Sequence, residues 1–246
     1  NNISITLPPL EEQKKIAQIL STWDEAIEVV DGLIEKKKKL FKSLSKKLFF
    51  HTNEWSKKKI SNFCNCYSGG TPSRKNPHFY EGDIPWIKSG ELNNIYIHET
   101  EEKITSEALA NSSAKIVEKN NILLALYGAT AGVIGFTKID ASINQAILAI
   151  IPDEKIVTKK YLLYYLRYVS PRIVHNNVQG GQPNLSGSII KSLDIFYPDI
   201  ENQNKIANAL EILEKEISLL ERKANLFKKQ KKGLMQRLLT GKVRVN

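Results

Sequence analysis

The 246-residue sequence is poor in cysteine, in methionine and in long apolar runs. Its two cysteines, Cys64 and Cys66, stand one residue apart, which strains an intrachain disulfide and supplies at most half of a metal site. No apolar run reaches the roughly 18 residues of a membrane span. The N-terminus lacks the basic and apolar regions of a secretory signal peptide. We therefore expect two reduced thiols in a cytoplasmic protein with no membrane contact.

The single methionine, Met235, lies near the C-terminus. The chain as printed therefore does not open on a translation start. We expect a fragment of a longer protein, or a product whose front end has been removed.

Signatures of enzymes are also missing. The glycines of GATAGVIG (128–135) do not fit G-x-G-x-x-G, and GGTPSRKN (69–76) lacks the spacing of a phosphate-binding loop. The four histidines are scattered, and the acids at 99–102 resemble a solvated loop. We expect no catalytic residue, no metal site and no cofactor on this chain. An enzyme with an unrecognised site is the disfavoured alternative.

What the sequence does contain is a repeat. LPPLEEQKKIAQIL (7–20) returns as YPDIENQNKIANAL (197–210) at an offset of 190. Apolar residues then recur in alternating steps of four and three, which predicts two long helices that pair as an antiparallel coiled coil. Lysine interrupts each seam, at Lys37 and at Lys231. These lysines either fix the register of the pair or extend to solvent near a helix end.

The middle of the chain has another character. Turn signals are frequent, and the short apolar runs 121–128, 132–138 and 146–152 predict strands. A helix is expected over 159–173. The predicted fold class is α+β: one mixed, β-rich domain at 51–196, flanked by a helix at 1–50 and a helix at 197–246.

Polar, glycine-rich loops in this middle domain are the candidate binding site. The formal net charge of +10 suits a polyanionic partner, nucleic acid above all. Gly70 would let the backbone approach a phosphate, and Arg74 would reach a phosphate or a guanine edge. The plain alternative for each loop is a turn that needs φ > 0. The candidate DNA-binding residues are Ser68, Gly69, Gly70, Thr71, Ser73, Arg74, Lys75, Lys88, Tyr127, Thr130, Gln179, Gln182 and Asn184, with 57–59 as further phosphate contacts.

These stretches resemble the specificity subunits of type I restriction–modification enzymes. The resemblance rests on the two repeats at 7–20 and 197–210, and on 69–92, 121–150, 180–195 and 233–245, which together span nearly the whole chain in the expected order. It implies a target-recognition domain that reads half of a split double-stranded DNA site, between helices that set the spacing. It also implies a non-catalytic subunit.

The resemblance further implies partners. Modification (methyltransferase) subunits would bind S-adenosylmethionine and methylate adenine, and restriction (endonuclease) subunits would join through them. The family has two recognition domains, whereas this chain has one, so residues 1–7 would be the tail of a missing first domain. The chain then corresponds to half a subunit or to a half that works as a homodimer on a palindromic site. The alternative is a coiled-coil protein-interaction module with no DNA role.

Overall fold

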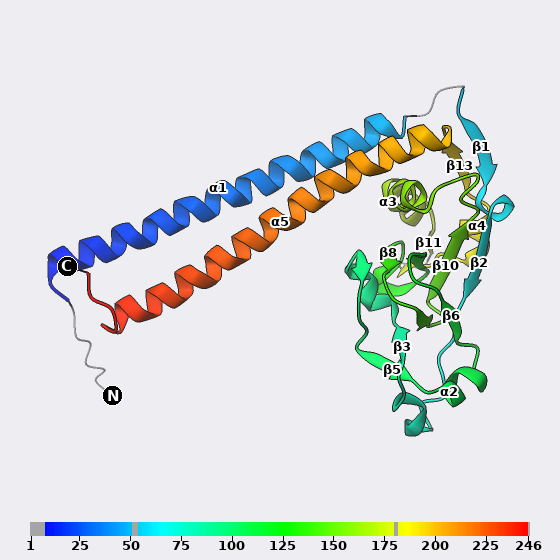
Figure 1. Cartoon of the computed structure of the whole chain (residues 1–246), viewed down its shortest axis with the longest axis horizontal. Helices are drawn as coiled ribbons and strands as arrows, with labels where there is room; N and C mark the ends of the chain where they lie inside the picture. Colours follow the sequence, from blue (N-terminus) through cyan, green and yellow to red (C-terminus); the bar gives the residue numbers. More distant parts are fainter. Residues whose placement is uncertain (1–7, 51–53, 180–181, 246) are drawn as a thin grey trace. The chain divides into compact units, whose positions relative to one another are not determined.

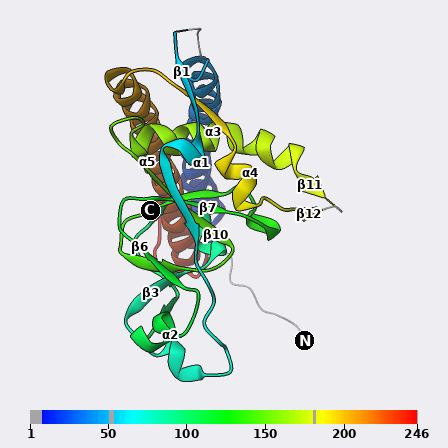
Figure 2. The same cartoon turned by 90° about the vertical axis from the view of Figure 1, so that its right-hand side faces the viewer.

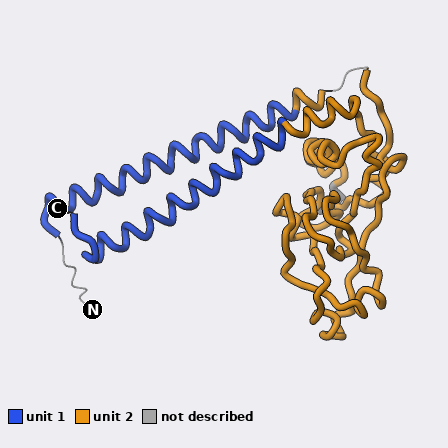
Figure 3. Tube along the Cα trace, in the orientation of Figure 1, with its two compact units in different colours: residues 1–45, 209–246 blue, residues 46–208 orange. Residues whose placement is uncertain are grey.

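The computed structural model describes residues 8–50, 54–179 and 182–245. The chain forms two compact units, shown in Figure 3: residues 1–45 with 209–246, and residues 46–208. The first unit is made of helices, and the second holds all the strands. Element labels follow Figure 1.

Two long helices pair in the first unit. Helix α1 (Leu10–Leu48) and helix α5 (Ile200–Leu239) both begin just after the proline of the repeat, with acids in the first turn and bases in the last, as the helix dipole favours. They lie side by side in Figure 1. Lys37 pairs with Glu216 at 2.8 Å, and Lys228 pairs with Asp31 at 3.0 Å. Partners early in one helix are late in the other, so the predicted antiparallel pairing is confirmed.

The seam between these helices is the predicted one. Val30 and Ile34 are buried against Ala224, and the ring of Trp23 meets that of Phe227 edge-on at 5.6 Å. Both seam lysines reach a carboxylate of the opposite helix, Lys37 that of Glu216 and Lys231 that of Asp24. Such cross-helix pairs depend on the alignment of the two helices, whereas the stems of both lysines still run along the seam to a partly exposed ammonium group, so the two interpretations of these lysines both stay open.

Two sheets form the centre of the second unit. The five-stranded sheet has the order β2-β10-β7-β8-β4, and the four-stranded sheet has the order β5-β3-β9-β6. The three predicted strands are confirmed as β7, β8 and β10. The strands of the first sheet are β2 (Cys64–Ser68), β10 (Ile147–Pro152), β7 (Ile122–Ala125), β8 (Ile134–Thr137) and β4 (Tyr96–Ile97); those of the second are β5 (Glu102–Ile104), β3 (Ile84–Ile87), β9 (Ala141–Ile143) and β6 (Lys115–Val117).

One apolar core serves both sheets. Ile87 and Val117 of the four-stranded sheet pack in the same buried cluster as Leu123 and Ile147 of the five-stranded sheet. The predicted helix is α3 (Lys159–Asn176), three residues longer than expected, and it contacts β8 and β10. Figure 2 shows a hairpin at the end of α3. This hairpin pairs β11 (Val178–Gln179) with β12 (Gln182–Pro183), and the second unit also holds the short helices α2 (Ser106–Ala110) and α4 (Gly187–Lys191).

The two ends of the domain are joined. Strand β1 (Ser56–Lys59) pairs antiparallel with β13 (Asp194–Tyr197), with Ser56 opposite Tyr197. The second unit also takes in residues 46–50 and 197–208, which the sequence assigns to the helices. The reason is packing: Phe49 contacts the rings of Tyr161 and Tyr165, and the start of α5 is bonded into the domain.

Candidate nucleic-acid interface

Three strand ends and their loops gather at one end of the five-stranded sheet. Leu148, near the start of β10, pairs with Ser68 at the end of β2 and with Leu124 near the end of β7. The segments 68–75, 144–146 and 126–133 therefore all leave the sheet at the same end. Since the strands are antiparallel, this convergence follows directly from the register.

Hydrogen bonds tie these loops together. The Leu126 N–H donates to the Ala146 carbonyl at 2.8 Å, and the Thr71 hydroxyl contacts the Gln145 side-chain oxygen. Tyr127 forms an isolated antiparallel bridge with Asn184, next to β12. The structure thus brings together Thr71, Tyr127 and Asn184, one residue from each of the three loops that the sequence singled out; residues 180–181 of the third loop lie outside the described residues.

The candidate residues differ in accessibility. Thr71, Ser73, Arg74, Lys75, Tyr127 and Asn184 are exposed, Ser68, Lys88 and Thr130 are half-buried, and Gly69 and Gly70 are buried. Gln179 and Gln182 belong to the described backbone of the β11–β12 hairpin, but their side chains lie outside the described residues. The accessible part of the site therefore comes from the tips of the loops.

Gly69 and Gly70 have a packing role. A Cβ at Gly69 would lie 1.8 Å from the Ile143 carbonyl oxygen, and one at Gly70 would lie 2.5 Å from the Ser113 carbonyl carbon. The Gly70 N–H donates to the Ile143 carbonyl at 3.1 Å, and its own carbonyl accepts from the Trp86 indole at 3.2 Å. This corrects the prediction that Gly70 brings the backbone to a phosphate, because its N–H is already used inside the domain. The alternative role, that of a glycine in a turn that needs φ > 0, applies to Gly128, whose φ is +79°.

Two of the predicted cations share one carboxylate. Arg74 pairs with Glu102 at 2.7 Å, and Lys88 pairs with Glu102 at 2.8 Å and with Glu101 at 2.9 Å. Hydrogen bonds from Arg74 and then Lys88 lower the pKa of Glu102, and the same contact raises the pKa of Lys88. The Arg74 guanidinium also stacks on the Tyr80 ring, 3.9 Å from its centroid. Both cations are therefore held within the domain while part of each stays accessible.

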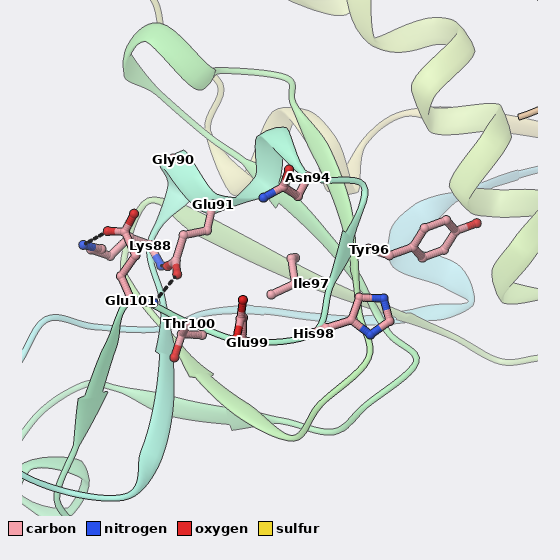
Figure 4. Close-up of a pocket in the computed structure, with 10 residues that line it drawn as sticks. All are labelled: Lys88, Gly90, Glu91, Asn94, Tyr96, Ile97, His98, Glu99, Thr100 and Glu101. Carbon is pink, nitrogen blue, oxygen red and sulfur yellow. Dashed lines mark hydrogen bonds and ion pairs between the residues drawn. The ribbon is translucent and has the colours of Figure 1, made fainter. Parts of the chain in front are cut away.

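A pocket of about 790 Å³ lies beside Lys88, and Figure 4 shows its lining. Glu91 closes one side: its carboxylate accepts from the Lys88 N–H at 2.6 Å and from the Glu101 N–H at 2.9 Å. Glu99 and Glu101 add further carboxylates to the wall. This acidic lining does not favour a phosphate backbone.

The lysines at 57–59 stand apart from the loops. They lie on β1, which leads through Ile60 to the start of β2, whereas the loops leave from the end of β2. Lys57 pairs with Asp194 at 2.9 Å. The structure does not bring 57–59 to the gathered loops.

Gln145 is exposed among the gathered loops but is not one of the residues predicted from the sequence. The available signal was the polar pair Asn144-Gln145 between two buried strands, β9 and β10. In the described part of the chain, no three His, Cys, Asp or Glu side chains are placed to hold a metal ion. None of the helices among 8–50, 54–179 and 182–245 is long and apolar enough to cross a bilayer.

The fold and the loops define a class of protein: a β-rich domain that presents polar loops and whose two ends continue into paired helices. The chain belongs to the family described as type I restriction modification DNA specificity domain, whose family model matches residues 1–38 and 52–228.

Curated relatives agree with this family, and a solved structure has the same fold. The type I restriction enzyme MjaIX specificity subunit of Methanocaldococcus jannaschii is 36% identical over 162 residues, 64% of this chain and 37% of that protein. The putative MjaX specificity subunit of the same organism is 27% identical over 99% of this chain and 60% of that protein. The chain thus spans 37% and 60% of the length of these two relatives. The HsdS subunit of Thermoanaerobacter tengcongensis has the same fold, with a TM-score of 0.65 at 18% identity over 97% of this chain and 61% of that one.

Proposed function

We propose that this chain recognises one half of a split double-stranded DNA target, as the specificity component of a type I restriction–modification complex. The observation that carries the proposal is the convergence of three polar loops at one end of the five-stranded sheet. Short polar side chains on such loops are suited to base edges in the major groove. The net charge of +10 supports a polyanionic partner.

Catalysis in this proposal belongs to the partners. Modification subunits carry S-adenosylmethionine and methylate the DNA, and restriction subunits join them in a cytoplasmic complex. The names of the relatives, which are specificity subunits of restriction enzymes, support this division of labour.

An apolar face of the helical unit supports the docking of a partner. Ile212, Leu219 and Leu226 recur every seven residues on α5 and are 68%, 63% and 58% exposed. Leu33 and Leu40, also seven apart, are exposed on α1. In an antiparallel pair with this seam, these positions share one face, which we call the aliphatic face.

The opposite face of the helical unit is charged. It carries the ion pairs Lys38–Glu221 and Asp31–Lys228. Exposed apolar side chains that gather on one face of a molecule are typical of a protein-binding surface. We propose that helices of the modification subunits cover the aliphatic face; a second copy of this chain is the alternative occupant.

The proposal is tested in two stages. Mapping of methylated adenines in cells that carry the complete system gives the target sequence. Loss of methylation at that sequence when this chain is removed shows that this chain recognises it. Binding of the purified chain to a duplex with that target is then measured at rising salt. We expect the affinity to fall steeply with salt, because phosphate contacts release counterions. An affinity independent of salt would instead favour the interaction module without a DNA role.

Paired variants separate the two surfaces. Asn184→Ala, in the gathered loops, is expected to weaken binding of the target duplex and to leave co-purification of the modification subunits intact. Leu219→Ser, on the aliphatic face, is expected to do the opposite. Loss of both activities in both variants would contradict the assignment of the two functions to separate surfaces.

A further inference from the structure

Gln145 occupies the central position among the gathered loops. It lies between β9 and β10, directly before Ala146, whose carbonyl accepts from Leu126 at 2.8 Å. Leu126 in turn precedes Tyr127, which bridges to Asn184. Gln145 is exposed, although the strands on both sides of its loop are buried. Its side chain therefore projects from a rigid base, which is the placement that precise recognition needs.

The amide of Gln145 is oriented by a neighbouring loop. Its side-chain oxygen is in contact with the Thr71 hydroxyl. A glutamine side-chain oxygen only accepts hydrogen bonds, so Thr71 is the donor and takes one of the two lone pairs of this oxygen. The contact with Thr71 holds the amide by its oxygen, so the group that the amide turns toward a ligand is the NH₂ group, with two donors.

This orientation has a consequence for the base that can be recognised. Adenine is normally bound by glutamine through both amide atoms, because adenine offers the N7 acceptor and the N6 donor. Guanine offers two adjacent acceptors, N7 and O6. We propose that Gln145, held by Thr71, is a specificity-determining residue that selects a G·C base pair in the DNA target. This inference rests on the proposed function.

The experiment is a binding selection with a pool of random-sequence DNA duplexes and the full chain. Wild type is expected to enrich a motif that contains a G·C pair at the position read by Gln145. Gln145→Ala is expected to lose selectivity at that single position, by about tenfold, with the rest of the motif unchanged. Gln230→Ala removes an exposed glutamine from α5 and is the matched control, expected to enrich the wild-type motif.

Thr71 provides the decisive variant. Thr71→Val removes the hydroxyl at similar volume, so the amide can turn and offer both atoms. The selected pair is then expected to change from G·C to A·T, whereas Thr71→Ser keeps the hydroxyl and G·C. Folding of each variant is checked by circular dichroism, and a variant that enriches the remaining motif positions is folded by that criterion too.

The outcomes distinguish the inference from the function on which it rests. Enrichment of no motif by wild type would overturn the proposed function. A motif that Gln145→Ala leaves unchanged at every position would overturn only the role of Gln145. Loss of selectivity at a pair other than G·C, or an unchanged pair in Thr71→Val, would overturn the orientation by Thr71.

Discussion

Gln13 and Gln203 occupy the same position in the repeated helix start, yet their surroundings differ. Gln13 is exposed, and its Nε2 donates to the Pro8 carbonyl at 2.8 Å. Gln203 makes the same local bond, to the Pro198 carbonyl at 2.9 Å, but is fully buried at 0% exposure. The chain therefore contains its own matched control for the contribution of one buried amide.

The buried copy has two additional partners. The Gln203 Nε2 also donates to the Ile156 carbonyl at 3.0 Å, and its Oε1 accepts from the Thr158 N–H at 2.8 Å. Thr158 is the N-cap of α3, so this side chain connects the start of α5 to the start of α3. Removing it leaves one backbone N–H and two carbonyls of the second unit without this partner.

The two alanine variants should therefore differ strongly. Each buried polar group left without a partner costs about 1–3 kcal/mol, so Gln203→Ala is expected to lower the free energy of unfolding by about 3 kcal/mol or more. Gln13→Ala removes one exposed bond and should cost about 0.5–1 kcal/mol. Urea unfolding followed by tryptophan fluorescence and circular dichroism measures both. Equal losses in the two variants would contradict the contribution assigned to the buried hydrogen bonds of Gln203.

Two further predictions concern charge. Glu102→Gln is expected to cost about 1 kcal/mol at pH 7, because the carboxylate holds Arg74 and Lys88. The pKa of Glu102 is lowered in the fold, so its contribution is present above the ordinary value of 4.5 and is lost as pH falls through the lowered pKa. Wild type and variant should therefore converge in acid, and a constant difference down to pH 2 would contradict this. Lys231→Leu replaces the ion pair with Asp24 by an apolar side chain that continues the seam, and should raise the free energy of unfolding of the helices by about 1 kcal/mol. Thermal unfolding followed by circular dichroism at 222 nm measures this change, and a lower unfolding midpoint in the variant would contradict the prediction.

The helices could be predicted from the sequence because their signals are local. Proline, first-turn acids and apolar steps of four and three lie within one segment, and they place the starts of α1 and α5 to within a residue or two. The strands at 121–152 were also visible, as apolar runs between turns. What these signals do not contain is the pairing order of the strands, which depends on contacts between distant residues.

The candidate site shows the same division. Loops with polar and glycine residues were recognisable, but their gathering depends on the register of Leu148 with Ser68 and Leu124. The pairing of Arg74 with Glu102 and the close packing of Gly69 on Ile143 are likewise long-range. The sequence therefore predicted which residues carry polar or charged groups suited to DNA. Whether those groups are free to contact a ligand depends on the fold.

The β1–β13 pair has a consequence for how such chains change. Because Ser56 lies opposite Tyr197, the first and last strands of the domain are adjacent. A domain with adjacent ends can be excised and replaced without altering the segments on either side. The loops, by contrast, come from segments far apart in sequence and are interlocked through Thr71, Gln145 and Asn184. Recombination at the two ends of the domain would therefore transfer the whole set of recognition loops in one event. Exchange of a single loop would instead disrupt the contacts between the loops.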